Sequence, residues 1–159
     1  MGKRRRSREI TLQFLYQYDT RAQTYTDEDN LGQEIELFWE ATGGHLEADV
    51  KEFSRTLILG TCENTRGIDS LINRFSEHWR IPRMPKIDRN VLRLAIYELV
   101  YLRSIPPPVT INEAVELAKK YSTEESGSFI NGILDRVRIA LLKGEIEHGY
   151  DKGTNIEGS

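Results

Sequence analysis

Apolar residues recur every three to four positions along almost the whole chain, and this spacing is the strongest constraint on its fold. Residues 68–79 are typical: Ile68, Leu71, Ile72, Phe75 and Trp79 would share one face of a helix. No segment alternates apolar and polar residues in the way that a half-buried strand does. The pattern therefore predicts an all-α protein.

The same spacing divides the chain into about seven helices, expected to pack as two helical bundles. We predict them over residues 8–22, 29–42, 46–62, 68–79, 85–103, 110–120 and 129–141. Residues 85–103 are the most hydrophobic segment and should be central. Residues 1–143 then form one domain, and the polar, glycine-containing residues 144–159 are predicted to be a disordered tail.

Prolines and polar residues indicate where several helices begin. Pro85 suits the first position of the central helix, and residues 106–108, three prolines, predict a rigid spacer. Thr110 and Glu113 match a capping box for the next helix. Gly132 lies within the last helix, where glycine costs about 1 kcal/mol relative to alanine. Gly132 indicates that another backbone or a ligand packs closely against the helix there. The alternative is that the glycine arose by neutral drift and has no structural role.

Residues 3–8 carry five positive charges in six positions, followed directly by the first helical pattern. The whole chain has a net charge of −3, so the rest carries −8, which favours one polyanion-binding place on an acidic body. If Ser7 caps the helix, Arg4 to Arg6 lie just outside it, where the helix dipole disfavours cations and phosphate binds readily. The alternative is a mobile, solvated tail.

A second basic face and a buried acid are predicted on the central helix. Lys86, Arg89, Asn90, Arg93 and Tyr97 occupy its less apolar arc, whereas Glu98 falls inside the apolar arc. We interpret Glu98 as a paired structural carboxylate rather than a catalytic acid, because no acidic or imidazole partner is evident.

Enzyme, metal and membrane functions find little support. The single Cys62 excludes an internal disulfide and suits a small core position, and three scattered histidines predict no metal site. No nucleophile–base pattern or phosphate loop is evident, no apolar run would span a bilayer, and no signal peptide is recognisable. We expect a soluble, cytoplasmic protein without cofactors that is not an enzyme.

A second candidate binding feature lies near residues 122–128, a predicted loop that ends at a helix start. Backbone N–H groups with Ser126 or Ser128 would suit a phosphate there, although a plain capping turn is the alternative. Phe129 beside it would stack on an unpaired base or pack in the core.

Five stretches stand out when they are taken together: residues 4–9, 12–17, 87–99, 111–119 and 129–135. In this order they resemble the NusB family of transcription antitermination factors, and the resemblance covers roughly residues 4–142. It implies a seven-helix, two-bundle fold that binds single-stranded boxA RNA of ribosomal RNA leaders, together with NusE, a small-subunit ribosomal protein, within the RNA polymerase antitermination complex.

The resemblance also implies roles for individual residues. Lys3, Arg4, Arg5, Arg6 and Arg8 form the expected RNA-binding arm, to which Gly127, Ser128 and Phe129 add contacts. Tyr16 and Asp88 match positions near the junction of RNA and NusE.

Two alternatives to a transcription factor are a homodimeric helical protein and an RNA-binding module associated with ribosomal RNA maturation. The second is weakened because the chain contains no α/β cofactor domain of the kind found in methyltransferases with a similar helical domain.

Overall fold

The computed structural model describes residues 2–21, 30–42, 45–77 and 81–149. Within these ranges it contains seven α-helices, one short 3-10 helix and no strand, which confirms the predicted all-α class. The helices are α1 (Lys3–Arg21), α2 (Leu31–Ala41), α3 (Ala48–Glu63), α4 (Thr65–Phe75), α5 (Lys86–Tyr101), α6 (Pro107–Tyr121) and α7 (Glu124–Leu142), with η2 (Ile81–Arg83) before α5. Trp79, predicted on the fourth helix, lies outside the described residues.

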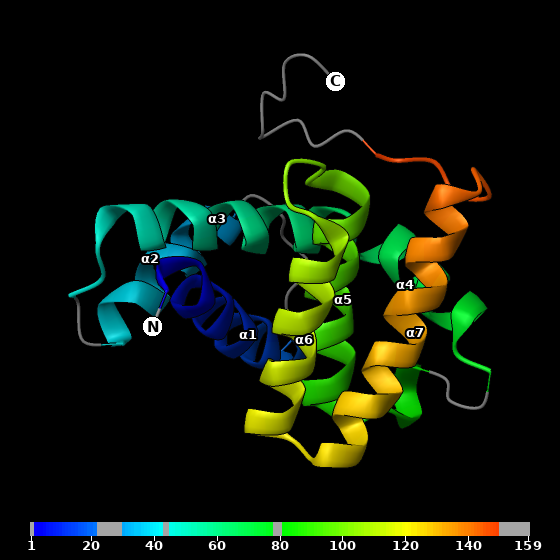
Figure 1. The fold of residues 1–159 in the computed structure, drawn as a ribbon. Coiled ribbons are helices and arrows are strands. Elements are labelled where there is room, and N and C mark those ends of the chain that lie inside the picture. The colour runs from blue at the N-terminus through cyan, green and yellow to red at the C-terminus, as the bar shows by residue number, and fades with distance from the viewer. Residues whose placement is uncertain (1, 22–29, 43–44, 78–80, 150–159) are drawn as a thin grey trace.

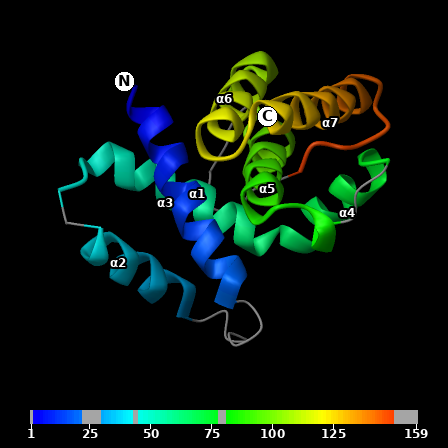
Figure 2. The same ribbon diagram turned by 90° about the horizontal axis from the view of Figure 1, so that it is seen from below.

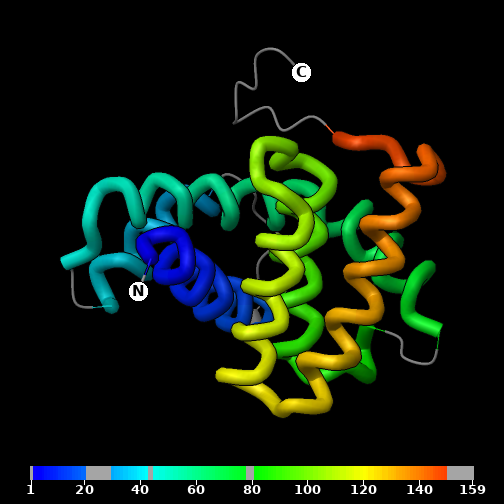
Figure 3. Tube along the Cα trace, viewed as in Figure 1, coloured from blue at the N-terminus to red at the C-terminus, as the bar shows by residue number. Residues whose placement is uncertain are grey.

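The helices form two groups (Figures 1 and 2). Helices α1, α2 and α3 make one group, and α4 to α7 make the other. The most extensive packing within each group is α1 on α3 and α6 on α7. Helix α5 contacts α1, α3, α4, α6 and α7, so the most hydrophobic segment is central, as predicted. The tube in Figure 3 shows α5, α6 and α7 running side by side, with α1 lying obliquely on one side of this group.

The α1–α2 contact is aromatic. Phe14 is buried, stacks on Tyr18 at 5.8 Å between ring centroids, and meets Phe38 of α2 edge to face at 5.5 Å. Such pairs add about 0.5–1.5 kcal/mol beyond the burial of their area. The large side chain of Phe14 therefore fixes α2 against α1.

Prolines set the starts of α6 and α5, and both starts differ from the prediction. Helix α6 starts at Pro107, within the three prolines. Proline is tolerated there because the N–H groups of the first helical turn have no partner in the helix, so the missing N–H costs no hydrogen bond. Thr110 is consequently inside the helix, and its hydroxyl donates to Glu98 Oε1 at 3.0 Å instead of capping. Pro85 precedes α5 as its cap residue rather than its first residue.

Helix α7 ends in a glycine cap, close to the predicted end of the domain. Gly144 has φ 74°, and the Glu145 N–H donates to the Ala140 carbonyl at 2.9 Å, the arrangement that satisfies the last carbonyls of a helix. Residues after this cap still contact the body, since Ile146 packs on the core and the Gly149 N–H donates to the Val100 carbonyl at 3.0 Å. Contacts with the helical body therefore continue as far as residue 149. The rest of the predicted tail, residues 150–159, lies outside the described residues.

Candidate nucleic-acid interface

The basic residues at the start of the chain belong to a helix. Helix α1 begins at Lys3, five residues before the predicted start, so the mobile-tail alternative is wrong for these residues. Ser7 is not a cap: it is buried, and its hydroxyl contacts the carbonyls of Lys3 and Val50 at 3.1 and 3.0 Å. Carboxylates from other helices offset the unfavourable cations in the first turn.

We call Lys3, Arg4, Arg5 and Arg6 the cationic pole. Lys3 lies 2.9 Å from Asp49 Oδ2, and Arg5 makes two hydrogen bonds to Glu113 at 2.8 and 3.1 Å. These hydrogen bonds raise the pKa of Lys3 and of Arg5, so both stay charged. Arg4 stacks on the Phe53 ring, with its guanidinium carbon 4.4 Å from the ring centroid.

The cationic pole borders an open pocket of about 400 Å³. Arg4 and Arg5 line one side, and the connection from α5 to α6, residues 104–106, lines another. Exposed guanidinium groups beside an open pocket can bind phosphate groups of an RNA backbone.

Arg8 also lines this pocket, but nearly all of its side chain is buried. Its guanidinium makes a two-point ion pair with Glu98, at 2.9 and 2.8 Å, and the two side chains are 4% and 1% exposed. The prediction that Arg8 contacts RNA is therefore corrected, because its donors face the core. The prediction that Glu98 is a paired structural carboxylate is confirmed.

The second predicted feature is a two-residue connection between α6 and α7, not a loop over residues 122–128. Thr123 caps α7 by accepting the Ser126 N–H at 3.0 Å, and the Ser126 hydroxyl donates to Asp88 Oδ2 at 2.8 Å. Ser126 is buried, so its donors are not available to a phosphate. The plain capping turn is the reading that fits.

Gly127, Ser128 and Phe129 lie in the first turns of α7 and differ in accessibility. Gly127 is buried, and a Cβ there would lie 3.0 Å from Lys119 Cγ, so the glycine lets α6 and α7 approach. Ser128 is exposed. Phe129 packs partly on the core and also lines a pocket of about 310 Å³. The structure therefore leaves part of the Phe129 ring open to a base.

Asp88 lines the same pocket as Phe129. It is buried, and its Oδ1 atom has no hydrogen-bond partner among the described residues. Tyr16 is exposed on α1. Lys86, at the start of α5, places its Nζ 6.0 Å from the centroid of the Tyr16 ring. Tyr16 can thus meet a partner directly, whereas Asp88 is accessible only through the pocket.

Lys120 is a surface cation that the sequence reasoning did not assign to the site. In the structure its Nζ lies 2.6 Å from Glu9 Oε2, which joins α6 to α1 near the cationic pole. No local pattern indicates this pair, because 111 positions separate the two residues.

Both arginines of the predicted second basic face of α5 are paired with carboxylates. Arg89 contacts Asp19 at 2.7 Å, and Arg93 contacts Asp69 at 2.8 Å. Tyr97, predicted on that face, is fully buried. Burial raises the pKa of Asp19, but hydrogen bonds from Arg89 and Asn90 and the charge of Arg93 outweigh burial, so its pKa lies below the usual value. This face ties α1 and α4 to α5.

Other chemistry finds no site in the part of the chain that the structure describes. Burial raises the pKa of Cys62 to about 12, so the thiol stays protonated. Within the described ranges no group of three His, Cys, Asp or Glu side chains could hold a metal ion. None of the helices there is both long and apolar enough to cross a membrane.

The fold and the site define a helical protein whose candidate binding surface is a cluster of cations at one helix end. A model of the NusB family matches residues 5–138. The chain belongs to the NusB family. It is accordingly a non-enzymatic protein, as the sequence analysis predicted.

Individual relatives agree with this assignment. A transcription antitermination protein NusB from Thermodesulfovibrio yellowstonii is 50% identical over 137 residues, which cover 85% of this chain and 91% of that protein. The structure of T. maritima NusB is 40% identical with a TM-score of 0.74, and the match covers 90% and 97% of the two chains. A chain in a crystal structure of NusB and NusE with double-stranded RNA is 28% identical with a TM-score of 0.75, covering 88% and 98%.

Proposed function

We propose that this chain is an RNA-binding transcription antitermination factor that acts with NusE on the boxA element of ribosomal RNA leaders. The observation that carries the proposal is the cationic pole, whose four side chains are displayed on the first turns of α1. The similar proteins named as antitermination factors, and the similar NusB chain solved with NusE and RNA, support it. The place of action is then the cytoplasm, in the antitermination complex of RNA polymerase.

In this proposal Lys3, Arg4, Arg5 and Arg6 attract the phosphates of single-stranded RNA. Arg5, for example, exchanges its ion pair with Glu113 for one with a phosphate of the RNA. Because each phosphate contact releases counterions from the RNA, the RNA affinity falls as salt is added. Phe129 and Ser128 contact the bases, and the Asp88 carboxylate in the same pocket accepts a hydrogen bond. Tyr16 lies where NusE extends the surface.

Binding of a labelled single strand that contains boxA, measured with and without NusE, tests the proposal. We expect salt-sensitive binding that NusE tightens, and weaker binding to a scrambled strand. A duplex of the same sequence shows whether single strands are preferred, since the similar solved complex contains double-stranded RNA. Equal affinity for boxA and scrambled strands, with and without NusE, would contradict it.

Sedimentation separates this proposal from a homodimeric protein. A dimer that conceals the RNA-binding surface should sediment unchanged when NusE is added. The RNA-binding factor is expected to form a complex with NusE of one chain each.

A further inference from the structure

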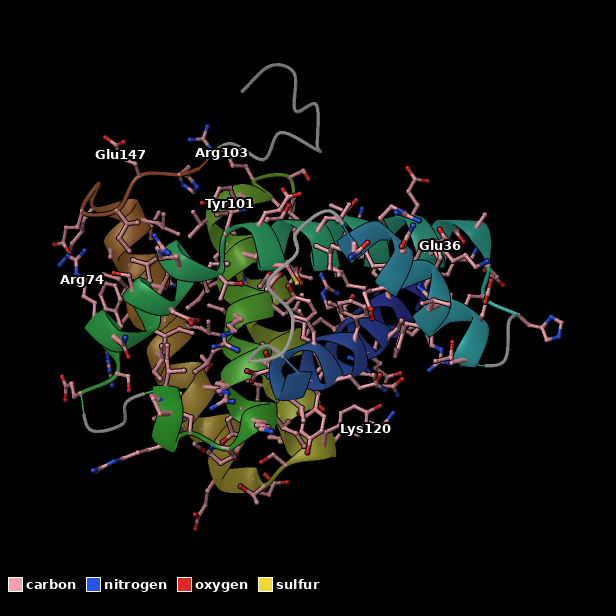
Figure 4. All side chains as sticks on the ribbon, turned by 180° about the vertical axis from the view of Figure 1, so that it is seen from behind. Glu36, Arg74, Tyr101, Arg103, Lys120 and Glu147 are labelled. Carbon is pink, nitrogen blue, oxygen red and sulfur yellow. The ribbon has the colours of Figure 1, made fainter. Side chains whose placement is uncertain are left out.

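Glu9 is a buried carboxylate shared by two surface cations. Its side chain is 3% exposed; Lys120 Nζ of α6 lies 2.6 Å from Oε2, and Arg6 of α1 lies 3.9 Å from Oε1. The two cations are half exposed, at 52% and 50%. Figure 4 shows Lys120 at the surface of the molecule. A fixed anion therefore holds an ammonium and a guanidinium close to each other at the α1–α6 boundary.

The three side chains have charge and donors to spare. Two cations around one carboxylate leave a net charge of +1. An ammonium has three N–H donors and a guanidinium has five, and the contacts with Glu9 use only a minority of them. The hydrogen bond to Glu9 also raises the pKa of Lys120, so the ammonium stays charged.

The position of the pair connects the two parts of the proposed RNA surface. Arg6 belongs to the cationic pole, and Lys120 lies two residues before the α6–α7 connection that adjoins the Phe129 pocket. Glu9 and Lys120 line a groove together with Arg5, Glu113 and Glu116, and the carboxylates inside this groove repel a phosphate. A phosphate is therefore favoured outside the groove, at the exposed halves of Arg6 and Lys120, over one inside it.

We propose that Arg6 and Lys120 together bind one RNA phosphate, with Glu9 as the residue that positions them. The ligand is a phosphodiester between the RNA segment at the cationic pole and the segment at Phe129. The inference rests on the proposed function and adds a specific contact to it.

The test is the salt dependence of RNA binding by Lys120→Gln. Each phosphate contact on a single strand contributes about 0.7 to the log–log slope, which corresponds to about fivefold in affinity at 0.1 M salt. We expect Lys120→Gln to lower the magnitude of the slope by about 0.7 and the RNA affinity by about fivefold. Lys120→Arg should keep the slope and the affinity of the unmodified chain. Lys143→Gln is the matched control, since Lys143 is an exposed lysine at the far end of α7. It should match the unmodified chain.

A double-mutant cycle tests whether the two cations share one phosphate. If they do, Arg6→Gln and Lys120→Gln together weaken binding by less than the product of the single effects. Independent effects that multiply would overturn the shared phosphate.

Stability is monitored in parallel by helicity, because Lys120→Gln leaves Glu9 with one partner fewer. If that variant unfolds, Glu9→Gln with Lys120→Gln removes both charges and leaves two amides, and the same loss of slope is expected. An unchanged slope in the folded variant overturns the inference while the salt-sensitive binding of the unmodified chain still supports the proposed function. Absence of salt-sensitive binding by the unmodified chain overturns both.

Discussion

Arg8 and Glu98 are joined by two hydrogen bonds inside the core, at 2.9 and 2.8 Å, and Glu98 also accepts the Thr110 hydroxyl at 3.0 Å. The three residues come from α1, α5 and α6. One charge cluster thus fixes the helix that carries the cationic pole against the helix that carries Asp88 and the helix that carries Lys120.

Breaking this pair should destabilise the fold. Arg8→Ala leaves Glu98 as a buried charge without its counterion, and such losses cost about 3–5 kcal/mol. Replacement of all three residues by apolar ones, Arg8→Met, Glu98→Leu and Thr110→Val, should cost far less, because no polar group remains unpaired. Urea unfolding followed by circular dichroism measures both.

The triple variant also tests the correction to the predicted RNA-binding residues. Arg8 has its donors in the core, so the folded triple variant should bind RNA as the unmodified chain does. A large loss of RNA affinity in a stable triple variant would return Arg8 to the interface.

Two glycines with opposite surroundings should respond oppositely to alanine. A Cβ at Gly60 would lie 2.0 Å from Tyr97 Cζ, whereas at Gly132 the nearest neighbour would be Arg136 NH2 at 3.8 Å. We expect Gly60→Ala to destabilise by about 3 kcal/mol or more, and Gly132→Ala to stabilise by up to about 1 kcal/mol. Thermal unfolding of the two variants checks this, and destabilisation by Gly132→Ala would show a close neighbour that the structure lacks.

Asp19 should make the stability depend on pH in the acid range. Its pKa is lower in the folded state than in the unfolded state, so its ion pairs stabilise the fold above the unfolded pKa of about 3.9. The stability advantage over Asp19→Asn should be constant above about pH 5 and shrink as the pH falls below about 4. Urea titrations of both proteins across pH 3–7 measure it; an advantage that grows toward acid pH would contradict the lowered pKa.

Phe129→Leu should separate stacking on RNA from packing in the core. Leucine keeps an apolar side chain, so the expected loss of stability is about 1 kcal/mol. Stacking on one base contributes about 1–3 kcal/mol, so RNA affinity should fall about tenfold or more. Phe75→Leu is the control, because Phe75 is also half-buried but lies on α4. Equal RNA affinity of the two variants would leave Phe129 a core residue only.

Periodicity in the sequence was sufficient to predict the helices, because their apolar faces are local features. The central place of α5 followed from its being the most hydrophobic segment, and Glu98 within its apolar arc was correctly predicted to be paired. Helix starts were less predictable where distant residues decide them. Helix α1 includes Lys3 and Arg5 because Asp49 and Glu113 neutralise them, and no local pattern shows those partners.

The candidate site was predictable in composition but not in exposure. The basic cluster at residues 3–8 was evident, yet whether each arginine faces solvent or Glu98 depends on the rotation of α1 against α5. Ser126 and Gly127 likewise suited a phosphate-binding loop, but their hydrogen bonds and burial depend on α5 and α6. Gly132, interpreted as a possible close contact, has open surroundings.

The most direct test of the account is the salt dependence of boxA RNA binding by the unmodified chain and by Arg4→Gln with Arg5→Gln. Three phosphate contacts at Lys3, Arg4 and Arg5 and one shared by Arg6 and Lys120 predict a log–log slope of about −2.8, and the double variant should lower its magnitude by about 1.4 with helicity unchanged. A slope near zero, or one that the double variant leaves unchanged, would contradict RNA binding at the start of α1.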